Sequence, residues 1–190
     1  MPASSDDALL VLVRERGALT DDEAAQIRAA WGAPREVAAG EVLLAPGAVC
    51  RALWFTDAGY AHFVSAAGET RHFVPPHTLA TIVASLYGRA PSREGIAMLT
   101  PGRVRTISRE AYERLTAACP AWDRFRTAYV RTVYAYLDRA LDDARRLTAA
   151  ERYAAFERDS PDVLLHVPLR HVASYLGMTP QSLSRVRAQR

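Results

Sequence analysis

Residues 168–190 read PLRHVASYLGMTPQSLSRVRAQR, and this stretch predicts two short helices joined by a tight turn. Ala173 is small enough to let two helix backbones approach closely, and Gly177 can adopt the left-handed conformation that ends a first helix. Thr179 is a suitable N-cap for a second helix, with Pro180 at its first position. The apolar positions expected to face inward are Val172, Leu176, Leu183 and Val186. The stretch therefore predicts a helix-turn-helix.

The face that this core leaves free is polar and basic. It carries Gln181, Ser182, Ser184, Arg185 and Arg187. From residue 168 onward there are four arginines and no acidic residue, whereas the whole chain has a net charge of only +3. A basic segment on a nearly neutral body suits the binding of phosphate groups. We therefore expect double-stranded DNA as the partner.

Length and composition describe a folded chain. It has 190 residues, of which 49% are hydrophobic and 24% are charged. Two distant cysteines, Cys50 and Cys119, predict neither a disulfide framework nor a metal or iron–sulfur site. No apolar run approaches the roughly 20 residues of a membrane span, and the start of the chain lacks a secretory signal pattern. We expect a cytoplasmic protein with no cofactor and no membrane contact.

The N-terminal part is expected to combine helices with an antiparallel β-structure. Residues 6–16 and 20–31 are predicted helices, the second beginning at the capping box Thr20–Glu23. Short apolar or alternating runs separated by Gly and Pro turns then indicate a sandwich, roll or barrel. These runs are 41–45, 52–57, 60–65, 69–74, 96–99 and 103–107. A further helix is expected over residues 108–118.

Residues 120–147 predict one helix about 42 Å long, with apolar side chains at spacings of three and four. One interpretation is that this helix packs entirely on its own domain. The preferred interpretation is that part of its stripe pairs with the same helix of a second copy, because a small roll cannot cover its length. The expected homodimer interface consists of Trp122, Phe125, Tyr129, Val133, Tyr136 and Ala140.

A second capping box, Thr148–Glu151, starts the next predicted helix. This helix is expected to end at Ser160-Pro161, and residues 163–167 are expected to form a short apolar link. The expected fold class is α+β, with an N-terminal β-roll, a long helix and a C-terminal helical domain. The predicted boundaries are 1–119 for the roll, 120–147 for the long helix and 148–190 for the helix-turn-helix domain.

Three stretches, in this order, carry a resemblance to a known family. Residues 39–47 (AGEVLLAPG) and 53–59 (LWFTDAG) look like the opening strands of a cyclic-nucleotide-binding-like roll. Residues 151–153 (ERY) precede Pro161, and residues 172–185 match a recognition pattern that includes a Ser-Arg pair. Together they resemble the Crp/Fnr family of bacterial transcription regulators. The resemblance covers nearly the whole chain.

The resemblance implies that two dyad-related helices, residues 179–190 of each copy, enter successive major grooves about 34 Å apart. It implies base contacts from Gln181, Ser184 and Arg185, and phosphate contacts from Thr179, Arg187 and Arg190. The family usually has a β-hairpin wing after this helix, and no such segment follows Arg190 here, so some phosphate contacts are expected to be missing. The alternative function is an effector-binding or protein-interaction module whose helix-turn-helix does not bind DNA.

The family's cyclic-AMP site uses a Gly-Glu pair, a short helix and an Arg-Ser/Thr-Ala segment. The matching stretch, residues 75–96, has no Gly-Glu, and Ser92 stands where the arginine belongs, followed by Arg93 and Glu94. A carboxylate at this place would repel a phosphate. We therefore expect no response to cyclic AMP, and Arg89 and Arg93 are the candidates for binding another anionic effector of unknown identity.

Other chemistry is not expected. His62, His72 and His77 lie in or near the roll but lack metal-ligand spacing, so we expect structural or surface histidines and no metal site. The sequence contains no nucleophile elbow, P-loop, dinucleotide fingerprint or HExxH motif. Its paired carboxylates fall at helix starts or on a helix surface. We therefore expect no catalytic residues and no enzyme activity.

Overall fold

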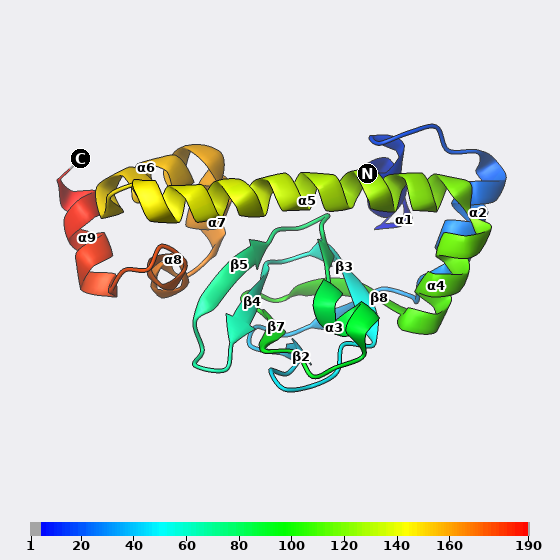
Figure 1. The fold of residues 1–190 in the computed structure, drawn as a ribbon, viewed down its shortest axis with the longest axis horizontal. Helices are drawn as coiled ribbons and strands as arrows, with labels where there is room; N and C mark the ends of the chain where they lie inside the picture. Colours follow the sequence, from blue (N-terminus) through cyan, green and yellow to red (C-terminus); the bar gives the residue numbers. More distant parts are fainter. Residues whose placement is uncertain (1–4, 190) are drawn as a thin grey trace.

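The structure is a computed structural model that describes residues 5–189, and it has the expected α+β architecture (Figure 1). One long helix, α5 (Pro120–Arg146), runs along a side of the molecule. The β-roll lies beneath the middle of α5, and a small helical unit lies at its C-terminal end. The helices near its N-terminal end are α1 (Ser5–Arg14), α2 (Asp21–Ala30) and α4 (Arg109–Ala118).

The roll consists of two four-stranded antiparallel sheets. One has the order β1-β8-β3-β6 and the other the order β2-β7-β4-β5, so that β5 is an edge strand. The strands are β1 (Arg35–Val37), β2 (Val42–Leu44), β3 (Ala52–Ala58), β4 (Ala61–Ser65), β5 (Thr70–Val74), β6 (Leu79–Ala80), β7 (Glu94–Met98) and β8 (Gly102–Ser108). Every predicted run overlaps a strand. The short elements β1, β6 and helix α3 (Val83–Gly88) were not predicted.

A tight turn between β3 and β4 requires a glycine. Gly59 has a φ of +82°, and a side chain there would come within 2.7 Å of the Pro101 carbonyl oxygen. The neighbouring strand β8 begins directly after Pro101, so the two sheets meet closely at this point. Only a residue without a Cβ fits both the backbone conformation and the space.

The main core joins the roll to the N-terminal helices. The Trp31 ring meets the rings of Phe55 and Trp122 edge to face, with centroid distances of 6.4 and 6.0 Å. Burying aromatic rings of this size dominates the stability of a small domain. The capping box at Thr20 and Glu23 forms as predicted and fixes the start of α2.

The first part of α5 belongs to this same core. Trp122 and Phe125 are buried, and Tyr129 packs against them. The prediction that Trp122 and Phe125 form the dimer interface is therefore wrong, because both side chains are covered by their own chain. By contrast, every residue from 131 to 139 is exposed.

The C-terminal helical unit has a second core. Its helices are α6 (Ala149–Asp159), α7 (Pro161–His166), α8 (Leu169–Tyr175) and α9 (Pro180–Ala188). The link expected at residues 163–167 is in fact mostly helix α7, which begins at Pro161 because proline is tolerated in a first helical turn. The buried side chains of this unit are Tyr153, Phe156, Val163, Val167, Val172, Ala173, Leu176 and Leu183.

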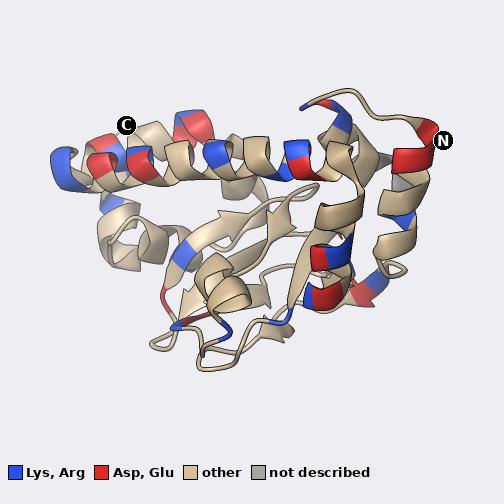
Figure 2. Ribbon diagram, turned by 45° about the vertical axis from the view of Figure 1, so that its right-hand side comes forward, with Lys and Arg blue, Asp and Glu red and all other residues tan. Residues whose placement is uncertain are grey.

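Charges of both signs are distributed along α5 (Figure 2). Asp142 and Arg146 form an ion pair one turn apart, with an Oδ1–Nε distance of 2.7 Å. No helix within residues 5–189 is long and apolar enough to span a lipid bilayer.

Candidate nucleic-acid interface

The turn between α8 and α9 has the geometry that the sequence predicts. Gly177 has a φ of +67°, and the Met178 N–H donates a hydrogen bond of 2.9 Å to the Ala173 carbonyl oxygen. These are features of a helix that ends in a left-handed glycine. Ala173 is fully buried, as close packing of two helices requires. The turn thus sets the angle at which α9 leaves α8.

Thr179 caps the start of α9. Its Oγ1 accepts a hydrogen bond of 3.1 Å from the Ser182 N–H, and Pro180 occupies the first helical turn. Leu183 is buried one turn later and holds the inner face of α9 on the second core. The cap and this anchor determine which side chains of α9 point outward.

The outward face of α9 brings the predicted base-contacting residues together. Gln181, Ser184 and Arg185 are all exposed, and so is Arg187. The Arg185 guanidinium lies 3.4 Å from the Ser182 hydroxyl, a long contact that leaves its donors available. Arg190 lies outside the described residues. The arrangement offers a rigid helix with amide and guanidinium donors, suited to hydrogen bonding with base edges.

The roll lacks the features of a phosphate site at the predicted position. Ser92 is buried, and its backbone groups pair with Gly47 and Ala48 at 2.7 and 2.9 Å. Arg93 is exposed, and Arg89 forms a solvent-exposed ion pair of 3.7 Å with Glu113. An anion at Arg89 would have to compete with this carboxylate.

The histidines of the roll differ in their surroundings. His62 is buried on β4, and its Nδ1 lies 2.9 Å from the Thr70 hydroxyl, whereas His77 is exposed. His72 lies on β5 near the rings of Tyr136 and Tyr175. Among the residues that the structure describes, no three His, Cys, Asp or Glu side chains are arranged to hold a metal ion.

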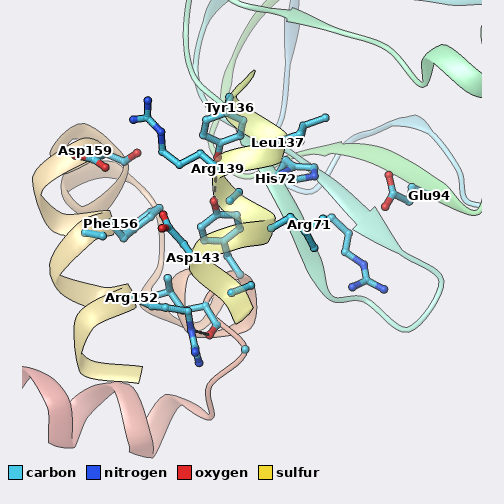
Figure 3. A pocket seen from close by; sticks show the side chains of 18 residues that line it. Arg71, His72, Glu94, Tyr136, Leu137, Arg139, Asp143, Arg152, Phe156 and Asp159 are labelled. Carbon is cyan, nitrogen blue, oxygen red and sulfur yellow. Dashed lines mark hydrogen bonds between the residues drawn. The ribbon is translucent and has the colours of Figure 1, made fainter. Parts of the chain in front are cut away.

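A groove of about 910 Å³ lies between α5, the β4–β5 side of the roll and the helical unit (Figure 3). No local sequence pattern predicts this groove, because elements far apart in the chain assemble it. Its wall contains both cations and anions, which gives no clear preference for either charge. These residues are Arg71, Arg139, Arg152, Glu94, Asp143 and Asp159. Tyr136, Phe156 and Tyr175 supply aromatic surface between them.

Comparisons with known proteins identify the fold. No protein-family model and no curated protein sequence matches the chain. Among solved structures, FixK2 from Bradyrhizobium japonicum has a TM-score of 0.72 at 17% identity, with 83% of each chain covered. The c-di-GMP responsive global regulator CLP of Xanthomonas campestris has a TM-score of 0.70 at 14% identity, covering 90% of this chain and 91% of its own.

A third similar structure is a transcriptional regulator described as a member of the Crp/Fnr family, from Eubacterium rectale. It has a TM-score of 0.68 at 14% identity and covers 88% of this chain and 82% of its own. Each of these three neighbours superposes on more than four-fifths of this chain. The chain therefore has the fold of the Crp/Fnr transcription regulators.

Proposed function

We propose that this chain is a dimeric, DNA-binding transcriptional regulator of the Crp/Fnr type. The observation that carries the proposal is the outward face of α9, where Gln181, Ser184 and Arg185 project together from a capped helix-turn-helix. In this proposal the roll (1–119) is the sensor domain, residues 120–147 join two subunits, and residues 148–190 bind DNA.

A second copy of the chain is the proposed occupant of an exposed stripe on α5. The stripe, which we call the seam, consists of Val130, Tyr134, Leu137 and Leu141. The predicted interface residues Val133, Tyr136 and Ala140 lie beside it on the same helix and remain part of the proposal. Its spacings of four, three and four are those of a coiled-coil contact, and its side chains are 38–71% exposed. An exposed apolar stripe on a long helix favours pairing with an identical helix. A two-fold axis along the seam would relate the two α9 helices.

The chemistry of α9 suits the major groove. An arginine can donate two hydrogen bonds to guanine O6 and N7, and a glutamine can pair with adenine N6 and N7. Arg185 and Gln181 are the side chains proposed for these contacts, with Ser184 between them. Arg187, Thr179 and Arg190 are proposed to bind phosphates, which add affinity without sequence information.

We also propose that cyclic AMP does not regulate this chain. The buried Ser92 offers no guanidinium to a cyclic phosphate, and the exposed Arg93 is followed directly by Glu94. A different effector is compatible with the fold, and Arg89 and Arg93 remain the candidates for binding an anion.

Selection of bound sequences from random DNA tests the proposal. We expect one enriched site whose binding weakens steeply with salt. Arg185→Ala should cost about 1–3 kcal/mol on that site and little on random DNA, whereas Arg187→Ala should weaken both equally. Arg28→Ala, at an exposed arginine of α2 at the opposite end of α5, is the matched control and should leave DNA binding unchanged. Absence of any enriched, salt-sensitive site would favour the alternative, an interaction module that does not bind DNA.

A further inference from the structure

The helical unit is docked on the free edge of the roll. Strand β5 is an edge strand, and its Thr70 N–H donates a hydrogen bond of 2.9 Å to the Ser174 hydroxyl on α8. The Tyr60 ring stacks on the His166 ring, with a centroid distance of 5.2 Å. The Phe73 ring contacts the Tyr175 ring at 5.2 Å. An exposed edge strand is thereby covered by another part of the same chain.

Two histidines share one hydroxyl at the centre of this docking surface. Nδ1 of His62, on β4, lies 2.9 Å from Thr70 Oγ1, and Nδ1 of His171, on α8, lies 3.3 Å from the same atom. The two rings are nearly perpendicular, with their centroids 5.1 Å apart. We call these three side chains the His–Thr–His cluster. It spans the boundary between roll and helical unit.

With both rings neutral, the cluster can satisfy its hydrogen bonds without a buried charge. Thr70 can donate its one hydroxyl proton to one Nδ1 and accept from the Nδ1–H of the other ring. Protonation of the accepting ring would leave the hydroxyl proton without this acceptor. It would also place a cation at a buried site beside a second imidazole, which is costly.

Burial opposes protonation of the docked histidines. His62 is 5% exposed, and its burial, followed by the proximity of His171, lowers its pKa to about 4. Burial also lowers the pKa of His171, with a further contribution from Arg170 on α8. Burial lowers the pKa of His72 on β5 as well; Glu94 on β7 opposes this shift and Arg71 adds to it.

We propose that the His–Thr–His cluster is a pH-sensitive latch: it holds the helical unit on the roll while both rings are neutral and releases it when they are protonated. The latch concerns two parts of one chain, so it stands or falls independently of DNA binding. If the chain does bind DNA, the latch would control how firmly α9 is positioned relative to the rest of the molecule.

The coupling between histidine protonation and docking gives the direction and size of the pH effect on the docking constant. Release of α8 would return His62 to water and to its ordinary pKa of 6.5, against about 4 when docked. The contribution to docking is therefore fully present above pH 6.5 and is lost as the pH falls toward 4. At pH 5 these two values predict a docking constant about 30-fold lower than at pH 8. The lowered pKa values of His72 and His171 act in the same direction.

Amide hydrogen exchange at Thr70 measures docking directly, because its N–H is bonded to α8. The full chain would be studied by NMR at pH 7.5 and 5.0, with rates corrected for intrinsic exchange. We expect the Thr70 protection factor to fall at least about 30-fold at pH 5.0. The Thr56 N–H, bonded to the Thr78 carbonyl oxygen inside the roll, is the internal reference and should stay protected. An unchanged Thr70 protection factor would overturn the latch.

A double variant separates the latch from general acid sensitivity. His62→Gln with His171→Gln retains neutral donors and acceptors but cannot be protonated at these two positions, so the fall in Thr70 protection at pH 5.0 should shrink to the part that His72 contributes. His77→Gln, at an exposed histidine outside the docking surface, should retain the wild-type fall. A pH 5.0 fall in the double variant as large as in the wild type would contradict the proposal.

If the double variant is already undocked at pH 7.5, an NMR titration of His62 in the wild-type chain tests the latch instead. Histidine Cε1 signals report each pKa separately. A His62 signal that titrates well below pH 6.5 supports the latch, and a His62 signal that titrates near pH 6.5 overturns it.

Discussion

The two halves of α5 carry similar apolar repeats but meet different surroundings. In the first half, Trp122 and Phe125 are buried in the core that joins the roll to the N-terminal helices. In the second half, residues 131–139 are all exposed, including Tyr134 at 71%. The first half therefore stabilises the subunit, and the second half offers surface to another molecule.

One helix can thus hold two apolar stripes with different surroundings. The inward stripe begins with Trp122, Phe125 and Tyr129, which pack in the main core. It continues through Tyr136 and Ala140, which line the groove together with Leu137 and Leu141 of the seam. The seam lies roughly a third of a turn away around the helix, at about 100° per residue. A substitution in one stripe should therefore affect the subunit, and a substitution in the other should affect its association.

The largest expected loss of stability follows a substitution in the buried half of α5. Trp122→Ala would remove a ring that contacts Trp31 and Phe125 and would leave a cavity. We expect a loss of about 3–5 kcal/mol in the free energy of unfolding, measured by urea denaturation followed by circular dichroism. A loss below 1 kcal/mol would mean that this half of α5 is not part of the core.

The sequence located α5 but could not separate its stripes. Apolar spacing predicts that a helix is amphipathic, yet it does not specify which molecule covers each side. Trp122, Phe125 and Tyr129 belong to the predicted dimer stripe because the helix is longer than a small roll can cover. Large aromatic residues fill cores as readily as interfaces, and only the position of the N-terminal helices reveals that these three are covered within the chain.

The exposed half should respond through association instead. Leu137→Glu would place a carboxylate in the seam of both subunits, where it has no partner. We expect the dissociation constant of the dimer, measured by analytical ultracentrifugation, to rise about 100-fold. The free energy of unfolding of the subunit should change little.

Ala135→Glu is the matched control for the seam. It adds the same charge to the same exposed helix, two residues away, on a face outside both stripes. Its dimer constant should equal that of the wild type within a few-fold. Equal weakening by both variants would show that net charge, rather than the seam, controls association.

Local signals in the sequence predicted the elements well, and long-range packing accounts for what was missed. Capping residues such as Thr148 and Thr179 act within one turn, and both form the predicted bonds. Strand β6 has two residues and is held by pairing with β3, so no local repeat marks it. The docking of α8 on β5 joins Thr70 to Ser174 across 104 positions, a distance that no local pattern can encode.

A smaller effect is expected at Tyr129, the last residue of the buried half. Its hydroxyl accepts a hydrogen bond of 3.1 Å from the Leu79 N–H on β6, and burial raises the pKa of this phenol. Tyr129→Phe keeps the ring and leaves that N–H without this acceptor, which should cost about 1–3 kcal/mol of unfolding free energy. The Leu79 N–H should then exchange with solvent faster than in the wild type. An unchanged exchange rate at Leu79 would mean that the loss of stability does not come from this hydrogen bond.

The smallest effect should occur at Tyr136, where the inward stripe continues into the exposed half. Its hydroxyl lies 2.9 Å from that of Tyr175 on α8, so the stripe there reaches the helical unit rather than the roll core. Because Tyr136 is 46% exposed, water can replace much of this bond, and Tyr136→Phe should cost less than about 1 kcal/mol. A double-mutant cycle with Tyr175→Phe isolates the pair, since the second substitution should cost nothing further once the first is present. Additive costs would mean that the two hydroxyls are not coupled, and that the inward stripe ends at Tyr129.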